Sequence, residues 1–159
     1  MNQNAGITKS KLYFELIAFA IAFLVAIVIL IPLYNNTLNY TFFLSNFLFI
    51  FLFITFTRYI FFLRFSIFSH ITIAKLIFIF ATIPLAVLLM DAFSVFQEYA
   101  DTIGLQEFVK HLDADRQSGI VAYMRNQMLF FGAGSILTCV LLAFRCIISI
   151  WRVRNRGTV

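Results

Sequence analysis

Long apolar runs alternate with short polar segments along the whole chain. Four windows, residues 12–33, 42–63, 73–90 and 128–150, consist mostly of Leu, Ile, Val, Phe and Ala. Each approaches or exceeds the roughly 20 apolar residues that a helix needs to cross the hydrocarbon core of a bilayer. Because lipid offers the backbone no hydrogen-bond partner, each window should be a helix. The pattern predicts an all-α polytopic membrane protein, a single membrane domain with four transmembrane helices.

The polar segment between the third and fourth windows, residues 91–127, has a helical pattern of its own. From Asp91 to Ile103 the apolar residues project within an arc of about 120°, and the polar residues take the opposite side. Gly104 suits the end of such a helix, and residues 105–112 repeat the apolar helical spacing. We expect two short amphipathic helices in this loop, before a fourth transmembrane helix that can extend back to Ser118.

Composition agrees with lipid as the solvent. Hydrophobic residues make up 62% of the 159 residues and charged residues 12%, against roughly 45–50% and about 25% in soluble domains. A soluble domain of this length has too little interior to hide so much apolar surface. The 22 Phe residues lie mainly in the apolar windows, where they favour contact with lipid over stacking on nucleic-acid bases.

Basic residues gather on one side of the four-helix pattern. Lys and Arg are enriched in cytoplasmic flanks, so both termini, including the basic tail of residues 151–159, are expected in the cytoplasm. We expect an integral plasma-membrane protein, in a bacterium one of the inner membrane. Nine bases and Glu15 give the cytoplasmic side a charge of +8, and the other side carries −3. The net charge of +5 therefore reflects topology and anionic lipid, and no nucleic-acid partner is expected. The nine bases are Lys9, Lys11, Arg58, Arg64, Lys75, Arg145, Arg152, Arg154 and Arg156.

Acidic residues are concentrated in the external loop. Six of the seven fall between Asp91 and Asp115. Helices that lie on a membrane surface usually present Lys and Arg to anionic lipid, so an acidic face favours a protein partner or solvent. Capping of the bundle or a position flat in the headgroup layer is the alternative. The candidate partner-binding residues are Phe93, Phe96, Glu98, Tyr99, Asp101 and Glu107.

Three charged residues fall inside the apolar windows. Glu15 is the only acid in a predicted transmembrane helix, and Arg58 and Arg145 lie at a similar depth on the second and fourth helices. Charge at this depth is costly, so we expect Glu15 to pair with one of the arginines. A carboxylate on the first of four helices resembles the small multidrug-resistance transporters, which implies proton exchange for cationic drugs. The shallow depth of Glu15 instead favours structural pairing.

Small residues form stripes on the first and fourth helices. Ala18, Ala22 and Ala26 share one face of the first helix, and Gly132, Ser135, Cys139 and Ala143 share one face of the fourth. Such stripes allow close helix approach in membranes. We expect the first and fourth helices to pack within one bundle, with self-association or docking onto a larger subunit as the alternative.

Several chemistries are excluded or disfavoured. Cys139 and Cys146 are about 10 Å apart along one helix and cannot form a disulfide with each other. The layout resembles the quinone-linked disulfide-generating membrane proteins, whose redox cysteines lie in external loops, but no residue here matches them. His70 and His111 fall outside the four predicted transmembrane helices, which disfavours a haem bound within the bundle. Glu107 and His111 lie one helical turn apart but lack further convergent ligands, so no metal or other cofactor is expected.

We expect a non-enzymatic protein that works through helix packing and the acidic loop. An accessory or interaction subunit of a larger membrane complex is favoured, and the partner is then another membrane protein or a second copy within the bilayer. One alternative is an immunity-type protein against a pore-forming toxin, which is similar in size, helix number and orientation. Another is an oligomeric transporter or channel that uses Glu15, Arg58 and Arg145.

Overall fold

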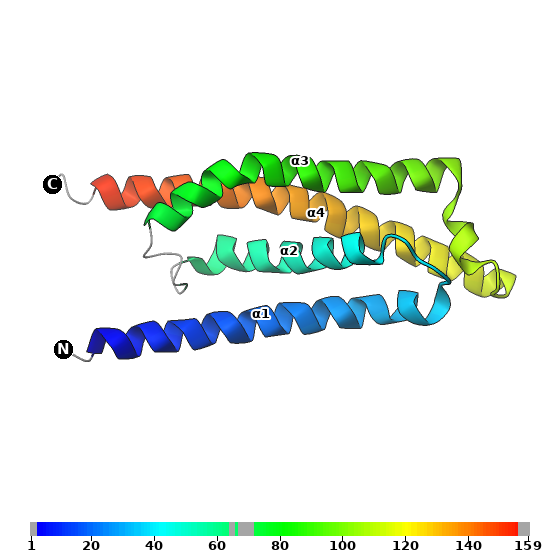
Figure 1. Cartoon of the computed structure of the whole chain (residues 1–159), viewed down its shortest axis with the longest axis horizontal. Helices are drawn as coiled ribbons and strands as arrows, with labels where there is room; N and C mark the ends of the chain where they lie inside the picture. Colours follow the sequence, from blue (N-terminus) through cyan, green and yellow to red (C-terminus); the bar gives the residue numbers. More distant parts are fainter. Residues whose placement is uncertain (1–2, 64–65, 67–71, 156–159) are drawn as a thin grey trace.

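The structure is a computed structural model that describes residues 3–63, 66 and 72–155, and the side chains from residue 10 onward. The predicted basic flanks Arg64 and Arg156, together with His70, lie outside the described residues, as does the side chain of Lys9. The helices are α1 (Gln3–Asn36), α2 (Phe43–Phe62), α3 (Thr72–Thr102), a short 3-10 helix η3 (Leu105–Val109) and α4 (Ala114–Asn155) (Figure 1). Strands are absent from the described part, which confirms the all-α prediction.

Each of the four α-helices contains a segment long and apolar enough to cross a membrane. The segments are Ser10–Asn36, Phe43–Phe62, Thr72–Thr102 and Ala114–Asn155. Large apolar side chains such as Leu16, Phe80 and Leu137 are mostly exposed along them. Exposure of this much apolar surface to water would be strongly unfavourable, and hydrocarbon removes that cost. Four apolar helices of this kind are compatible with an integral membrane protein.

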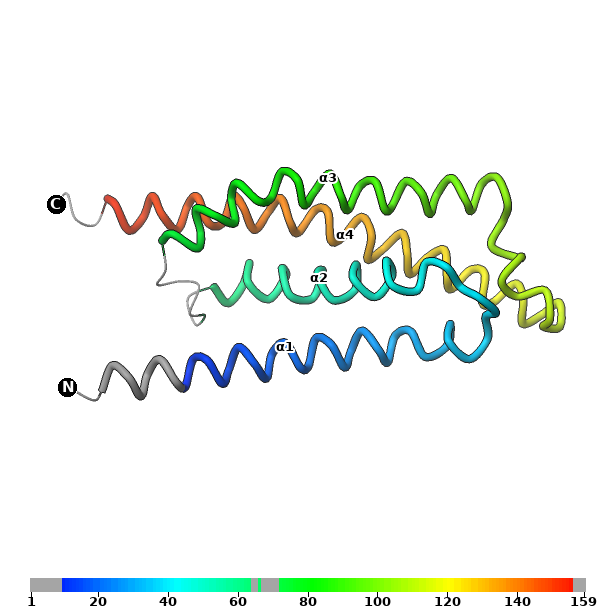
Figure 2. Tube along the Cα trace, viewed as in Figure 1, coloured from blue at the N-terminus to red at the C-terminus, as the bar shows by residue number. Residues whose placement is uncertain are grey.

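The α-helices run side by side along the long axis of the molecule (Figure 2). The start of α1 and the end of α4 lie together at one end, here called the terminal end, and η3 lies at the other, the η3 end (Figure 1). Helices α2 and α4 therefore run parallel, from the η3 end toward the terminal end. Helix α4 packs mainly against α2 and α3, whereas α1 packs mainly against α2 and touches α4 only slightly.

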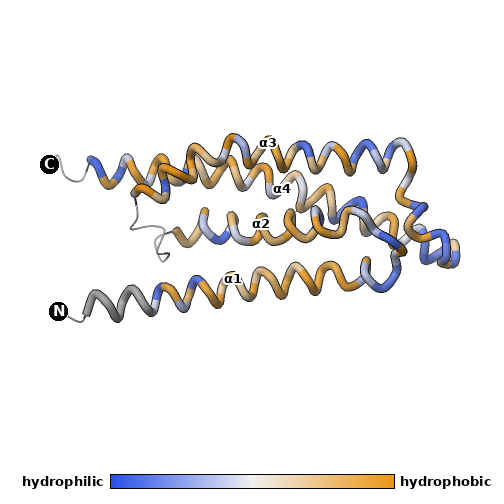
Figure 3. The backbone as a smooth tube through the Cα atoms, viewed as in Figure 1, coloured by the Kyte–Doolittle hydropathy of each residue, from blue (hydrophilic) through white to orange (hydrophobic). Residues whose placement is uncertain are grey.

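Two helices are much longer than a bilayer crossing requires. Helix α3 has 31 residues and α4 has 42, which correspond to about 46 and 63 Å at 1.5 Å per residue, against a hydrocarbon core of about 30 Å. Hydrophilic residues gather on the portions of both helices nearest η3 (Figure 3). We infer that this end projects beyond the hydrocarbon.

The two separate amphipathic helices predicted for the external loop are not confirmed. Residues 91–102 continue α3 without a break, because no Gly or Pro occurs from Leu85 to Ile103. The second predicted helix is only the five-residue η3. Between them Gly104 adopts a φ of +89°, a conformation that side chains with a Cβ rarely take, and its N–H donates to the Tyr99 carbonyl at 3.1 Å.

An aromatic cluster closes the η3 end of the bundle. Its five rings are those of Tyr40, Phe42, Phe96, Tyr99 and Phe108, which we call the aromatic cap. The Phe42 ring lies 5.4 Å from that of Phe96 and 5.2 Å from that of Tyr99, both edge to face. The Leu38 N–H also donates to the Phe108 carbonyl at 3.0 Å. The connection between α1 and α2 is thereby joined to η3.

Candidate functional site

A buried carboxylate near the terminal end is the centre of the main polar site. Glu15 lies on α1 and is 8% exposed. It accepts hydrogen bonds from Arg58 Nη2, from Ser66 Oγ and, at 3.1 Å, from the Tyr59 hydroxyl. All three donors come from α2 or from the segment that follows it. The site therefore attaches α1 to α2 and to the connection beyond α2.

Arg58 is the arginine that pairs with Glu15. Its guanidinium carbon lies 4.5 Å from the ring centre of Tyr59, 5.5 Å from that of Phe19 and 6.0 Å from that of Phe14. Rings at these distances attract a cation through their negative faces. The ion pair is thus covered by aromatic side chains on the α1 and α2 surfaces.

Arg145, the other candidate partner, lies apart from this site. It is on α4, half-buried, and no described acidic residue forms an ion pair with it. The reason is the order of the helices, since α1 packs on α2 and touches α4 only slightly. The three charged residues predicted within the apolar windows therefore do not form one cluster.

The geometry around Glu15 favours a structural role over proton exchange. An arginine stays charged at every accessible pH, so Glu15 has a permanent cationic partner and two further donors. Glu15 also follows Ser10, the first residue of its candidate span, by only five residues, or about 7.5 Å. Coupled transport sites usually lie near the middle of the bilayer. The chemistry of the site is that of a fixed ion pair.

Lys75 is a polar residue that the sequence pattern did not identify as buried. Lys75 was counted only among the basic residues of the cytoplasmic side, and it is 1% exposed and donates to Ser149 Oγ on α4 at 3.0 Å. A signal was present: Lys75, Thr82, Leu89 and Phe96 are the buried residues of α3 and recur every seven positions. That spacing marks one face of a helix that packs on a neighbour.

The small-residue stripes of α1 and α4 are buried or half-buried. Ala22, Ala26, Gly132, Ser135 and Cys139 are buried, and Ala18 and Ala143 are half-buried. A Cβ added to Gly132 would lie 2.5 Å from the Phe93 ring on α3, so the fourth-helix stripe receives an aromatic ring of α3. Helices α1 and α4 touch only slightly, and the packing of the two stripes on each other stays a prediction. Small residues show that a neighbour approaches closely, and they do not show which neighbour it is.

The candidate partner-binding residues divide into two groups. Phe96 is 1% exposed, and Phe93 and Tyr99 pack against the hydrophobic core. Because α3 continues into this region, its apolar face remains against the bundle, and these three aromatic residues do not form an open surface. Glu98, Asp101 and Glu107 are exposed, with Glu107 paired to Lys110. The open part of the predicted surface is acidic.

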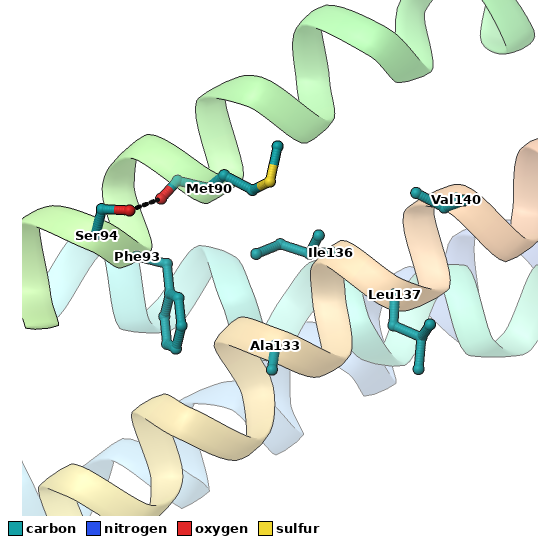
Figure 4. A pocket seen from close by; sticks show the side chains of 7 residues that line it. All are labelled: Met90, Phe93, Ser94, Ala133, Ile136, Leu137 and Val140. Carbon is teal, nitrogen blue, oxygen red and sulfur yellow. Dashed lines mark hydrogen bonds between the residues drawn. The ribbon is translucent and has the colours of Figure 1, made fainter.

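A second feature is an apolar groove between α3 and α4. Met90, Phe93 and Ser94 line one side and Ala133, Ile136, Leu137 and Val140 the other, around a volume of about 490 Å³ (Figure 4). A neighbouring hollow of about 420 Å³ shares Met90 and Val140. The Ser94 hydroxyl donates to the Met90 carbonyl at 2.9 Å, which leaves the groove without a free polar group. Such a lining suits hydrocarbon chains and offers no catalytic group.

Metal and thiol chemistry has little support in the described residues. No group of three or more His, Cys, Asp or Glu residues there could hold a metal ion. Cys139 and Cys146 are free thiols, both fully buried on α4. Comparison with known proteins finds no matching family model, no matching curated protein and no matching solved structure.

Proposed function

We propose that this protein is a non-enzymatic interaction subunit of a membrane complex, which binds its partner through the acidic surface at the η3 end. The observation that carries the proposal is the burial pattern of that end. The apolar face of α3 packs inside the molecule, and Glu98, Asp101 and Glu107 remain exposed on a rigid support. A preformed acidic surface suits a partner that presents Lys or Arg, because complementary charge steers association and sets orientation.

The partner in this proposal is another membrane protein with basic residues at the same height above the bilayer. A second copy of this chain is the other possibility. Most of its basic residues lie far from the η3 end, which makes like-with-like contact through this surface electrostatically unfavourable. An immunity role is a special case of the same proposal, in which the basic partner is a pore-forming toxin.

The test is charge reversal followed by identification of bound proteins. The triple variant Glu98→Lys, Asp101→Lys and Glu107→Lys should lose the partner when the protein is purified in mild detergent. The neighbouring Lys110→Glu makes the same surface more acidic and should retain it. Mass measurement separates a captured partner from a homo-oligomer. Unchanged recovery of the partner by the triple variant would exclude the acidic surface.

The alternative transporter function has less support. It requires Glu15, Arg58 and Arg145 to act together, and Arg145 lies apart from the Glu15–Arg58 pair. Glu15→Gln separates the two functions in cells. Loss of protein would indicate a structural ion pair, whereas normal abundance with loss of substrate-dependent proton flux would indicate transport.

The proposal also includes an orientation. We place the terminal end in the cytoplasm and the η3 end outside, in a bacterium at the inner membrane, because the basic residues favour that arrangement. Both native cysteines are buried, so single introduced cysteines can be labelled selectively. Gln106→Cys should react with a membrane-impermeant maleimide in intact cells, and Arg154→Cys should react only after the membrane is opened. The reverse result would invert the topology.

A further inference from the structure

Two carboxamide side chains are buried in the seam between α2 and α4. Asn46 is 0% exposed and Gln127 is 6% exposed. Neither the oxygen nor the nitrogen of either carboxamide has a hydrogen-bond partner among the described residues. Buried amides are almost always satisfied in folded proteins, and in a membrane protein the surrounding hydrocarbon makes an unsatisfied amide more costly. Four unpaired polar atoms in one seam therefore indicate a ligand with donors and acceptors of its own.

The register of α2 and α4 places these two carboxamides at the same level. The helices run parallel, and a Cβ added to Gly134 would lie 2.8 Å from the Phe53 ring, so these two positions are in contact. Asn46 precedes Phe53 by seven residues, and Gln127 precedes Gly134 by seven. Seven residues are two helical turns, about 10.5 Å, and return each helix to nearly the same face. Asn46 and Gln127 therefore lie level with each other, on the two sides of one seam.

A third polar group borders the same place. The Tyr40 hydroxyl, in the connection between α1 and α2, is buried and has no partner among the described residues. Burial raises the pKa of Tyr40, and the nearby Asn46 side chain opposes part of that rise. The hydroxyl is therefore a neutral donor and acceptor next to Asn46, although no well-formed hydrogen bond joins the two.

The surroundings restrict what this site can hold. The buried neighbours in sequence and along the seam are apolar, and the three polar groups carry no charge, which disfavours an ion. The aromatic cap lies over the site on its η3 side. The buried residues beside it are Phe42, Phe49, Ile50, Met124 and Met128. A small neutral molecule that both donates and accepts hydrogen bonds is the chemistry that fits.

We propose that Asn46, Gln127 and Tyr40 form an internal water site that bridges α2 and α4. A buried water typically makes about three hydrogen bonds to protein groups that otherwise have none. The water here would accept from the nitrogen of one carboxamide, donate to the oxygen of the other and donate its second proton to the Tyr40 hydroxyl, which gives one atom of each side chain a partner.

Two hydroxyls further along α4 are not part of this site. The Ser135 hydroxyl donates to the Gly132 carbonyl at 2.8 Å, and the Thr138 hydroxyl to the Gly134 carbonyl at 2.8 Å. These hydroxyls are already satisfied by their own helix and need no water. On α2, the Thr57 hydroxyl and Arg58 Nη1 are also buried without a partner among the described residues, and the proposal does not extend to them.

X-ray radiolysis in mild detergent tests the proposal on the intact protein. Radiolysis splits bound water in place, and the hydroxyl radical formed oxidises the nearest side chains. Met124 and Met128 are fully buried and flank Gln127 on one face of α4, so both should be oxidised to sulfoxide. Cys139 is equally buried on the same helix and reacts with the radical at least as readily, but it lies beside satisfied hydroxyls. It should be oxidised much more slowly.

The variant Asn46→Leu with Gln127→Leu should reduce Met124 and Met128 oxidation to the rate of Cys139. Ser135→Ala, which removes a hydroxyl already bonded to its own helix, should leave their oxidation unchanged. Oxidation of Met124 and Met128 at the Cys139 rate in the unaltered protein would overturn the proposal. Oxidation of Met124 and Met128 at the same rate in the double variant as in the unaltered protein would also overturn it. The first comparison needs no substitution, so it decides the question even if the double variant fails to fold.

Discussion

Replacement of Glu15 by Gln tests whether the Glu15–Arg58 pair holds α1 in the bundle. The glutamine has nearly the same shape, and its single oxygen can still accept a hydrogen bond from Ser66 or from Tyr59, which contact different oxygens of Glu15. What it removes is the negative charge opposite Arg58. The guanidinium would then remain at the same depth without a counter-charge, held only by the rings of Phe14, Phe19 and Tyr59.

The size of the effect follows from burial. Removal of one member of a fully buried ion pair costs about 3–5 kcal/mol. The side chains of Arg58 and Glu15 are 17% and 11% exposed, and the aromatic rings retain roughly 0.5–1 kcal/mol of cation–π attraction, so the cost should be smaller. We expect a loss of about 1–3 kcal/mol in the free energy of unfolding. At about 2–4 °C per kcal/mol this corresponds to a fall in Tm of roughly 2–12 °C.

The two buried thiols provide the assay. Cys139 and Cys146 are fully buried, so a dye that becomes fluorescent on reaction with thiols reports their exposure as detergent-solubilised protein is heated. Glu98→Gln removes an exposed acid and serves as the control, with no expected change in Tm. Glu15→Gln combined with Arg58→Gln should recover part of the loss, because no unpaired charge remains. A Glu15→Gln protein as stable as the unaltered chain would refute a structural role for the pair.

Two further predictions concern glycine packing and pH. Gly132→Ala should destabilise the protein by about 1–3 kcal/mol, because the new Cβ would lie 2.5 Å from the Phe93 ring. Gly119→Ala, on the same helix but with nothing within 4 Å of the added Cβ, should stabilise it by roughly 0.5–1 kcal/mol. Thiol-dye melting measures both, and equal effects would contradict the packing of α3 on α4. Burial raises the pKa of Tyr40 above its ordinary value of 10.0, so the folded state holds the phenol proton more tightly than the unfolded chain. The stabilising contribution is therefore complete below about pH 10 and is lost as the pH rises above that value. Melting followed by circular dichroism from about pH 9 to about pH 12 should show this alkaline loss, with a smaller loss in Tyr40→Phe.

The sequence predicted the helical class and the four apolar spans because both depend on local pattern. Length and hydrophobicity determine whether a segment can cross a bilayer, and no tertiary contact is needed to see it. The division of the external loop was harder to predict. Helical periodicity runs through Met90 and Asp91 without a change, so the polarity switch there looks like a helix boundary although the backbone continues.

The contacts between helices were only partly predictable. The unfavourable depth of Glu15 and Arg58 pointed to an ion pair, but Ser66 joins Glu15 through a segment beyond α2 whose course no periodicity describes. The sequence indicated that a neighbouring helix approaches α4 closely at Gly132. The ring that packs there is Phe93 of α3, and which helix approaches depends on the packing of the whole bundle. Lys75 is buried although basic residues near helix ends are usually solvated, and only its seven-residue spacing with Thr82 and Leu89 indicates this in the sequence.

The weak attachment of α1 has a consequence for how the chain is made. Helix α1 is synthesised before α2 and α4, and it packs mainly on α2 and scarcely on α4, which itself packs on both α2 and α3. Its main polar attachments are the Glu15 site and the hydrogen bond from the Tyr123 hydroxyl to the Ile29 carbonyl, at 2.7 Å. The second of these needs α4, which is synthesised after α1, α2 and α3. Helix α1 therefore gains this attachment only after the other three α-helices have been made, and until then the Glu15 site alone fixes it by polar contacts.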